Sequence, residues 1–323
     1  MLASSPSTIA ETELALEKPQ EAPKPGSRWR RPKSQRLGIG AWLALIWMGI
    51  VILGGIFIPM IIHSNANANA LAGHSSQGIF KVASHPLGFD RNGNDMLLNL
   101  AKGARNSMVV SIGAVTFGLI VGGTLGLIAG YYKRAVDGVL TTFFNTLLAI
   151  PQFVLALSLV TVFATTAIDA EGNQTAPSSL RRLVVLIFAL GVVSIPILAR
   201  ITRANSLQWS QREFVLAARA QGATNRRVMI REVLPNVLPA MFSIALLAIA
   251  VVIVAEGGLS ILGIGVLPPA VSWGNMIAST RADLITLPYE LFEPIACIFF
   301  TVLSLNYLGD IVRARTDVRE SAL

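Results

Sequence analysis

Six long apolar runs constrain this chain more than any other feature of its sequence. Each run is free, or nearly free, of Asp, Glu, Lys and Arg, and each approaches or exceeds the ~20 residues that a helix needs to cross a bilayer core about 30 Å thick. Backbone polar groups in lipid must bond within their own segment, so the runs predict an all-α membrane protein. The predicted spans are 37–62, 106–132, 138–168, 183–199, 237–255 and 293–309.

The basic residues predict how these spans are oriented. Only 14% of the residues are charged, against about 25% in ordinary globular domains, yet the net charge is +8. With the N-terminus inside, 19 of the 26 Lys and Arg residues fall in inner segments. Because cytoplasmic loops carry the excess of Lys and Arg, both termini are expected in the cytoplasm. The basic residues are spread over four inner segments without a recognition motif, so nucleic acid is not expected as a partner.

The spans also divide the chain into segments. Residues 1–36 are expected to form a basic, partly disordered cytoplasmic tail. The apolar run 37–62 is too long for a signal peptide, whose apolar region has about 7–15 residues, so it is expected to remain as the first span. The predicted core, 106–313, holds the other five spans. The remaining predicted segments are the outer loop 63–105, the cytoplasmic loop 200–235, the outer loop 256–290 and the cytoplasmic tail 314–323.

The sequence holds no motif for chemistry of its own. It has no G-x-x-x-x-G-K-[ST] phosphate loop, and the glycines at 258 and 263 are one residue too far apart for a G-x-S-x-G turn. His63, His74 and His85 lack metal-ligand spacing, so we expect no catalytic residue, metal or cofactor in this chain. A self-sufficient channel or secondary carrier would need charged residues within its spans, and these are almost missing. Uphill transport would therefore need energy from a partner.

Glycines recur every fourth residue in the second span, at Gly118, Gly122, Gly126 and Gly130. The spacing gives three G-x-x-x-G steps on one helix face, which lets another helix backbone come close. Two readings are open: helix packing inside the bundle, or a surface along which helices slide. Pro151 lies inside the long third run, where a proline removes a backbone hydrogen bond and predicts a break or a tilted, extended helix.

The inner loop between the fourth and fifth spans predicts two short helices joined at a glycine. Ser210 and Glu213 have the spacing of a capping box, which predicts that a helix starts at Ser210. Gly222 is placed to end this helix in the left-handed conformation. A second helix is predicted from near Thr224 to just before Pro235, which would stand at the entry to the fifth span.

This loop resembles the EAA signature of permease subunits in bacterial ABC importers. Ala217, Ala218, Gly222, Leu234 and Pro235 match the signature, whereas Leu216 and Glu232 stand where it has Glu and Ile. The resemblance implies a type I ABC importer permease whose loop is a coupling helix seated in a groove of an ATPase subunit. A salt bridge made by the family's Glu cannot be transferred to Leu216. The implied coupling residues are Glu213, Ala217, Ala218, Gly222, Arg226, Arg227, Leu234 and Pro235.

Two outer motifs, at 85–107 and 256–274, are similar to the C-type permease subunits of dipeptide, oligopeptide and nickel importers. The resemblance implies a peptide importer in the bacterial inner membrane. Nickel, haem and peptide-like conjugates are alternative substrates. The implied partners are a second permease subunit in a heterodimer, two ATPase subunits or domains that hold ATP and Mg, and an extracytoplasmic substrate-binding protein.

The second of these motifs follows the fifth span. Glu256, Ser260, Gly263 and Trp273 are therefore candidates for an outer gate or a receptor-facing surface. A plain loop that caps the fifth and sixth spans is the other reading.

Overall fold

The computed structural model describes residues 38–62, 73, 76–82, 85–164, 167–168, 174–175, 179–281 and 285–320. The contacts within the chain divide it into two units, Met1–Gly38 and Ile39–Leu323. Every helix and strand described below belongs to the second unit. The predicted tail 1–36 and the histidines His63 and His74 lie outside the described residues.

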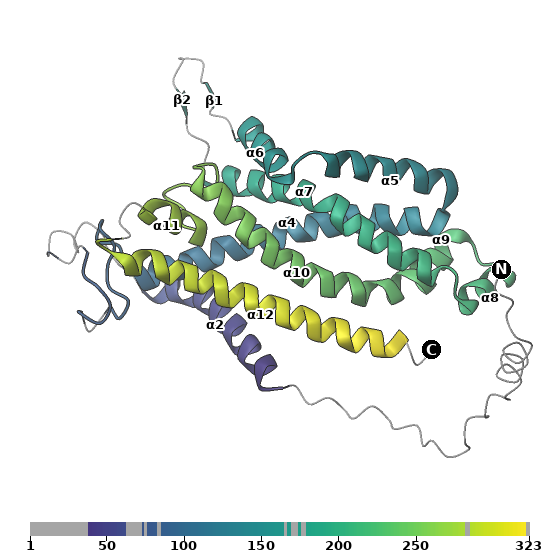
Figure 1. Ribbon diagram of the computed structural model, residues 1–323, viewed down its shortest axis with the longest axis horizontal. Coiled ribbons are helices and arrows are strands. Elements are labelled where there is room, and N and C mark those ends of the chain that lie inside the picture. Colours follow the sequence, from purple (N-terminus) through teal and green to yellow (C-terminus); the bar gives the residue numbers. More distant parts are fainter. Residues whose placement is uncertain are drawn as a thin grey trace, which may run out of the picture. The chain divides into compact units, whose positions relative to one another are not determined.

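Helices dominate this unit, as the apolar runs predict. Five of them are long and apolar enough to cross a membrane, and a bent pair of helices is a sixth candidate (Figure 1). The five are α2 (Ile39–Ile61), α4 (Met96–Tyr132), α7 (Ser179–Trp209), α10 (Leu234–Ile261) and α12 (Pro288–Glu320); the bent pair is α5 (Arg134–Ala149) and α6 (Gln152–Phe163). Shorter elements are β1 (Ala167–Ile168), β2 (Gln174–Thr175), α8 (Glu213–Ala220), α9 (Asn225–Val228), the π-helix η1 (Met229–Val233) and α11 (Trp273–Thr280).

The long third run is broken at Pro151. Helices α5 and α6 meet there at an angle of 85°, and Ile150 has an extended backbone between them. Proline cannot donate the backbone bond that would continue α5, which explains the break. The run also ends earlier than its composition predicts. Helix α6 stops at Phe163, and β1 at 167–168 pairs antiparallel with β2.

Several helices extend beyond the charge-free runs that predict them. Helix α4 begins at Met96 rather than at 106, because Asp95 caps it by accepting a hydrogen bond of 2.8 Å from the backbone N–H of Leu98. The same carboxylate pairs with His85. Helix α7 continues to Trp209, ten residues past the predicted end at 199. The first charged residue therefore does not mark where a helix ends.

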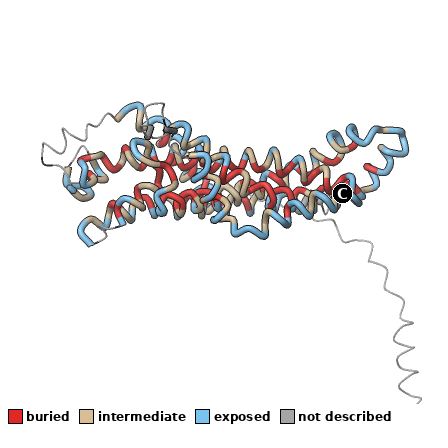
Figure 2. Tube along the Cα trace, turned by 90° about the horizontal axis from the view of Figure 1, so that it is seen from above, coloured by how far each residue is buried: buried red, intermediate tan, exposed pale blue. Residues whose placement is uncertain are grey.

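The glycine stripe lies where α4 meets α7. A Cβ atom added to Gly122 would come within 2.5 Å of the Ile195 carbonyl oxygen, and one added to Gly126 within 2.3 Å of the Ala199 carbonyl oxygen. Both distances are far below van der Waals contact, so only glycine permits this approach of the two helices. Buried residues follow the faces along which the helices meet (Figure 2). This geometry favours the packing reading of the stripe.

Candidate functional site

The loop after α7 lies at one end of the helices, opposite α11 (Figure 1). Its first helix, α8, starts at Glu213 with Arg212 as the N-cap residue, and no side chain caps it. The predicted capping box at Ser210 is therefore wrong. Because α7 continues to Trp209, Ser210 belongs to the turn that ends α7, and its hydroxyl donates to the carbonyl oxygen of Leu207 at 2.9 Å.

Helix α8 ends in a left-handed turn at Gly222. Its φ is +85°, a conformation that side chains rarely adopt. The Gly222 N–H donates to the Arg219 carbonyl at 2.9 Å, and the Ala223 N–H donates to the Ala218 carbonyl at 3.1 Å. These two bonds form a Schellman motif, which satisfies the last carbonyls of α8 and turns the chain toward α9.

The second helix of the loop does not stop before Pro235, contrary to the prediction. Residues Asn225–Ile261 form one continuous helix in which α9 leads through η1 into α10. Pro235 lies in the first turn of α10, directly after the π-helical turn. A π turn is wider than an α turn, so it accommodates a residue that has no N–H and whose ring crowds the preceding turn.

One face of this loop is anchored to the ends of α4 and α7. Val215 and Val228 are fully buried in a cluster with Trp209, Leu127 and Tyr131. Two cations cover the aromatic rings of this cluster: the Arg219 guanidinium lies 4.9 Å from the centre of the Tyr131 ring, and the Arg212 guanidinium lies 5.3 Å from that of Trp209. These contacts hold one face of the loop against the ends of α4 and α7.

The opposite face of the loop is exposed to solvent. Among the predicted coupling residues, Ala218 and Leu234 are half-buried, and the exposed ones are Glu213, Ala217, Gly222, Arg226, Arg227 and Pro235. Leu216, the departure from the EAA signature, is 54% exposed beside them. A face that combines apolar side chains with arginines is typical of a protein interface.

Three of the four predicted outer-gate residues belong to an internal network. Glu256 is 1% exposed, and its Oε1 accepts hydrogen bonds of 2.8 Å from the hydroxyls of both Ser260 and Ser272. Its Oε2 accepts a longer bond of 3.4 Å from Ser107 on α4. The network joins α10, α4 and the segment before α11. The sequence did not predict Ser107 and Ser272 as the hydrogen-bond partners of Glu256.

Trp273 extends this network. Its backbone N–H donates to Ser107 Oγ at 3.2 Å, and its indole N–H donates to the Leu100 carbonyl at 3.0 Å. Trp273 is 1% exposed and Ser260 is also buried, whereas Gly263 is exposed at a positive φ of +78°. The burial of Glu256, Ser260 and Trp273 argues against a receptor-facing surface at these three residues, and their role in an outer gate stays a prediction. Their hydrogen bonds link the segment before α11 to α4 and α10.

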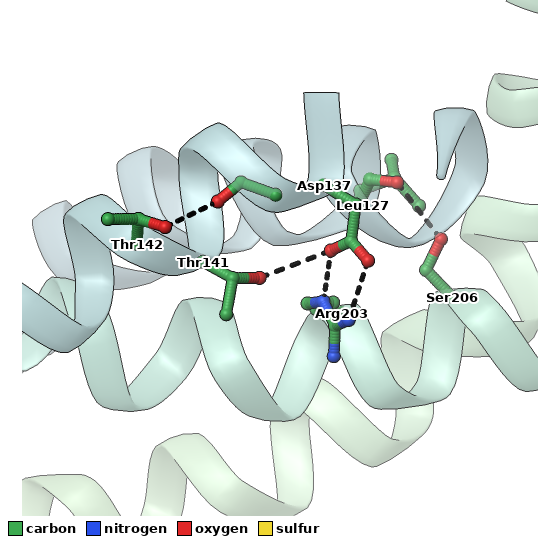
Figure 3. Close-up of polar contacts among 7 residues, drawn as sticks. Leu127, Asp137, Thr141, Thr142, Arg203 and Ser206 are labelled. Carbon is green, nitrogen blue, oxygen red and sulfur yellow. Dashed lines mark hydrogen bonds and ion pairs between the residues drawn. The ribbon is translucent and has the colours of Figure 1, made fainter. Parts of the chain in front are cut away.

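A bidentate ion pair joins α5 to α7 near the end of α7 that leads into the α8 loop (Figure 3). Arg203 donates to Asp137 through Nε and through Nη2, the second contact being 2.6 Å. Thr141 donates to the same carboxylate at 3.2 Å. Nothing in the local sequence pairs these residues, which lie on different helices.

A cavity of about 780 Å³ lies among α6, α7 and α10. Its walls are mostly apolar. The polar residues that line it are Gln152, Ser194, Asn205, Gln208, Ser243 and Arg313. Within the described ranges, no group of three or more His, Cys, Asp or Glu side chains is arranged to hold a metal ion.

Comparison with known families agrees with this geometry. Residues 122–320 match the family described as the inner membrane component of binding-protein-dependent transport systems. The chain belongs to this family. It is the transmembrane permease subunit of an ABC importer, a multi-pass membrane protein of the transport class predicted from the EAA loop.

Individual relatives cover almost the whole permease. It is 32% identical to the dipeptide transport system permease protein DppC of Alkalihalophilus pseudofirmus, over 93% of this chain and 96% of that protein. It is 29% identical to the glutathione transport system permease protein GsiD of Pectobacterium atrosepticum, over 85% and 89% of the two chains. A chain of the inward-facing MetNI methionine ABC transporter shares the fold, with a TM-score of 0.51 and 18% identity over 68% of this chain and 97% of that one.

Proposed function

We propose that this permease subunit imports dipeptides and oligopeptides, as one half of a permease heterodimer. The relatives named for dipeptide and glutathione transport support the peptide class. The observation that carries the proposal is α8, a short helix with one face packed on the spans and the other exposed. A partner protein that binds the exposed face can displace this helix, and the displacement is passed to the spans on which the helix packs.

The exposed face of α8, together with the neighbouring arginines of α9, is the docking surface for one of two ATPase subunits or domains. Small Ala217 allows close approach, Arg226 and Arg227 supply charge for acidic groups of the partner, and Leu216 makes an apolar contact in place of the family's Glu. ATP and Mg bind in these partners, and this chain contributes no cofactor. The arginine-rich ends of the inner loops favour a cytoplasmic position for α8 and for both termini.

The solute path includes the cavity among α6, α7 and α10. Its volume of about 780 Å³ suits a short peptide, and amide and hydroxyl side chains such as Gln152, Asn205 and Gln208 match the hydrogen-bonding groups of a peptide backbone. A second permease subunit closes the open side of the path. An extracytoplasmic binding protein delivers the peptide to the outer segment that Glu256 and Trp273 fasten.

Uptake of labelled substrates tests this proposal. In cells whose own copy of the gene is deleted, we expect uptake of a radiolabelled dipeptide to fall to background and to return when the wild-type chain is restored. Depletion of ATP should stop this uptake, whereas an ionophore with ATP maintained should not. Parallel assays with glutathione, nickel and haem identify the substrate class. Unchanged dipeptide uptake in the deletion strain, with loss of nickel or haem uptake instead, would reject the peptide assignment.

A further inference from the structure

Helix α5 is held to the rest of the chain at few points. Phe144 is the one fully buried side chain among its described residues, and it packs against Ile195 and Ala199 of α7. One turn from the start of α5, Asp137 forms its bidentate pair with Arg203 (Figure 3). The ion pair is therefore the only strong polar link that the described residues show between α5 and α7.

Sharp turns bound α5 at both ends. At the junction with α4, Lys133 and Arg134 have positive φ values of +56° and +52°, which cost energy for residues other than glycine. At the other end the chain bends by 85° at Pro151 into α6. A helix between two such turns can change its tilt without deforming its neighbours, since the turns take up the rotation.

The end of α7 that carries Arg203 is continuous with the coupling loop. Ser206, three residues on, donates to the Leu127 carbonyl of α4 at 3.0 Å, and Trp209 packs in the cluster that buries Val215 of α8. A displacement of α8 therefore moves the segment of α7 on which Arg203 lies. Directly after the break at Pro151, Gln152 and Phe153 of α6 line the cavity.

We propose that the Asp137–Arg203 pair transmits the movement of the coupling loop to the broken span α5–α6, and through it to the wall of the cavity. This inference rests on the proposed function of α8 and the cavity. Asp137 and Arg203 are positioning residues in this account, since neither needs to touch the solute. Arginine suits the task because its planar guanidinium holds both carboxylate oxygens and fixes the direction of the link.

The experiment compares import with ATP hydrolysis in the complete importer, reconstituted in vesicles with its own partner subunits. For Asp137→Asn we expect the solute imported per ATP hydrolysed to fall about tenfold while hydrolysis continues, a loss typical of a broken coupling between sites. Arg203→Lys keeps the positive charge but loses the planar guanidinium that binds both carboxylate oxygens, so it should lower the same ratio. The exchanged pair, Asp137→Arg with Arg203→Asp, should recover much of it. Arg200→Gln is the matched control, because Arg200 is exposed on α7 one turn earlier.

Two results would overturn the inference. One is an unchanged ratio of import to hydrolysis in Asp137→Asn. The other is a parallel loss of import, ATP hydrolysis and membrane-inserted protein that the exchanged pair does not recover. That result would mean that the ion pair is needed for folding alone. Failure of the proposed function looks different: the wild-type complex itself would hydrolyse ATP without importing peptide.

Discussion

Replacing Gly222 by valine is expected to abolish import while the permease remains in the membrane at its normal level. Gly222 ends α8 at a φ of +85°, and the left-handed conformation costs a residue with a Cβ about 1–2 kcal/mol, with a larger cost for a β-branched one. A Cβ at this position would meet no atom within 4 Å, so the effect comes from the backbone alone. Relaxing that strain breaks the Schellman bonds and turns the exposed face of α8 away from the ATPase.

Graded substitutions at this position separate conformation from side-chain size. Gly222→Asn should retain most import, because asparagine tolerates the left-handed region, and Gly222→Ala should be intermediate. The measurement is dipeptide uptake, normalised to the amount of permease in the membrane. Full uptake by Gly222→Val would show that the turn at Gly222 is not needed for coupling.

Replacing Glu256 by leucine is expected to destabilise the permease by about 2–5 kcal/mol, the range for breaking a buried polar network. The hydroxyls of Ser260 and Ser272 would lose their shared acceptor, and Ser107 would lose its bond to Oε2. Without these bonds the segment before α11 should detach from α4 and α10. We expect a lower midpoint of thermal unfolding in detergent and faster proteolysis between residues 262 and 272.

Glu256→Gln is the control for this prediction. Glutamine keeps an oxygen that can accept the bonds from Ser260 and Ser272, so its unfolding midpoint should lie between those of Glu256→Leu and the wild type. If Glu256→Leu unfolds at the wild-type midpoint and its segment 262–272 resists protease as before, the network does not fasten that segment.

Features that depend on neighbouring residues could be predicted from the sequence. The apolar runs give the helical fold, because a bilayer demands a minimum length of apolar helix. The break at Pro151 follows from a missing N–H, and the positive φ at Gly222 follows from its position after a helix. Each of these is local chemistry, and each is seen in the structure.

Helix ends were less predictable. Ser210 has the right residue type and spacing for an N-cap, but α7 continues to Trp209 and takes Ser210 into its final turn. Pro235 should interrupt a helix, but the π turn before it keeps α9 and α10 continuous. In both places tertiary packing of a long helix outweighs a local signal.

Contacts between distant parts of the chain could not be predicted at all. Asp137 and Arg203 are 66 positions apart, and Ser107 and Glu256 are 149 apart. A single sequence gives the residue types of such pairs but not the packing that brings them together. The burial of Glu256 inside its network, which argues against a receptor-facing role, depends on the same long-range packing.

The central claim is that the exposed face of α8 contacts an ATPase subunit, and cysteine cross-linking tests it most directly. Cys297 is the one native cysteine, so the measurement uses a Cys297→Ala background. In membranes from cells that make the whole importer, Ala217→Cys should cross-link to the ATPase subunit, with a yield that changes when ATP is added. Ile285→Cys, at a position that is 95% exposed just before α12 and is expected on the outer side, should give no such product. Normal import with no cross-link from Ala217→Cys, or an ATPase cross-link from Ile285→Cys, would contradict the account.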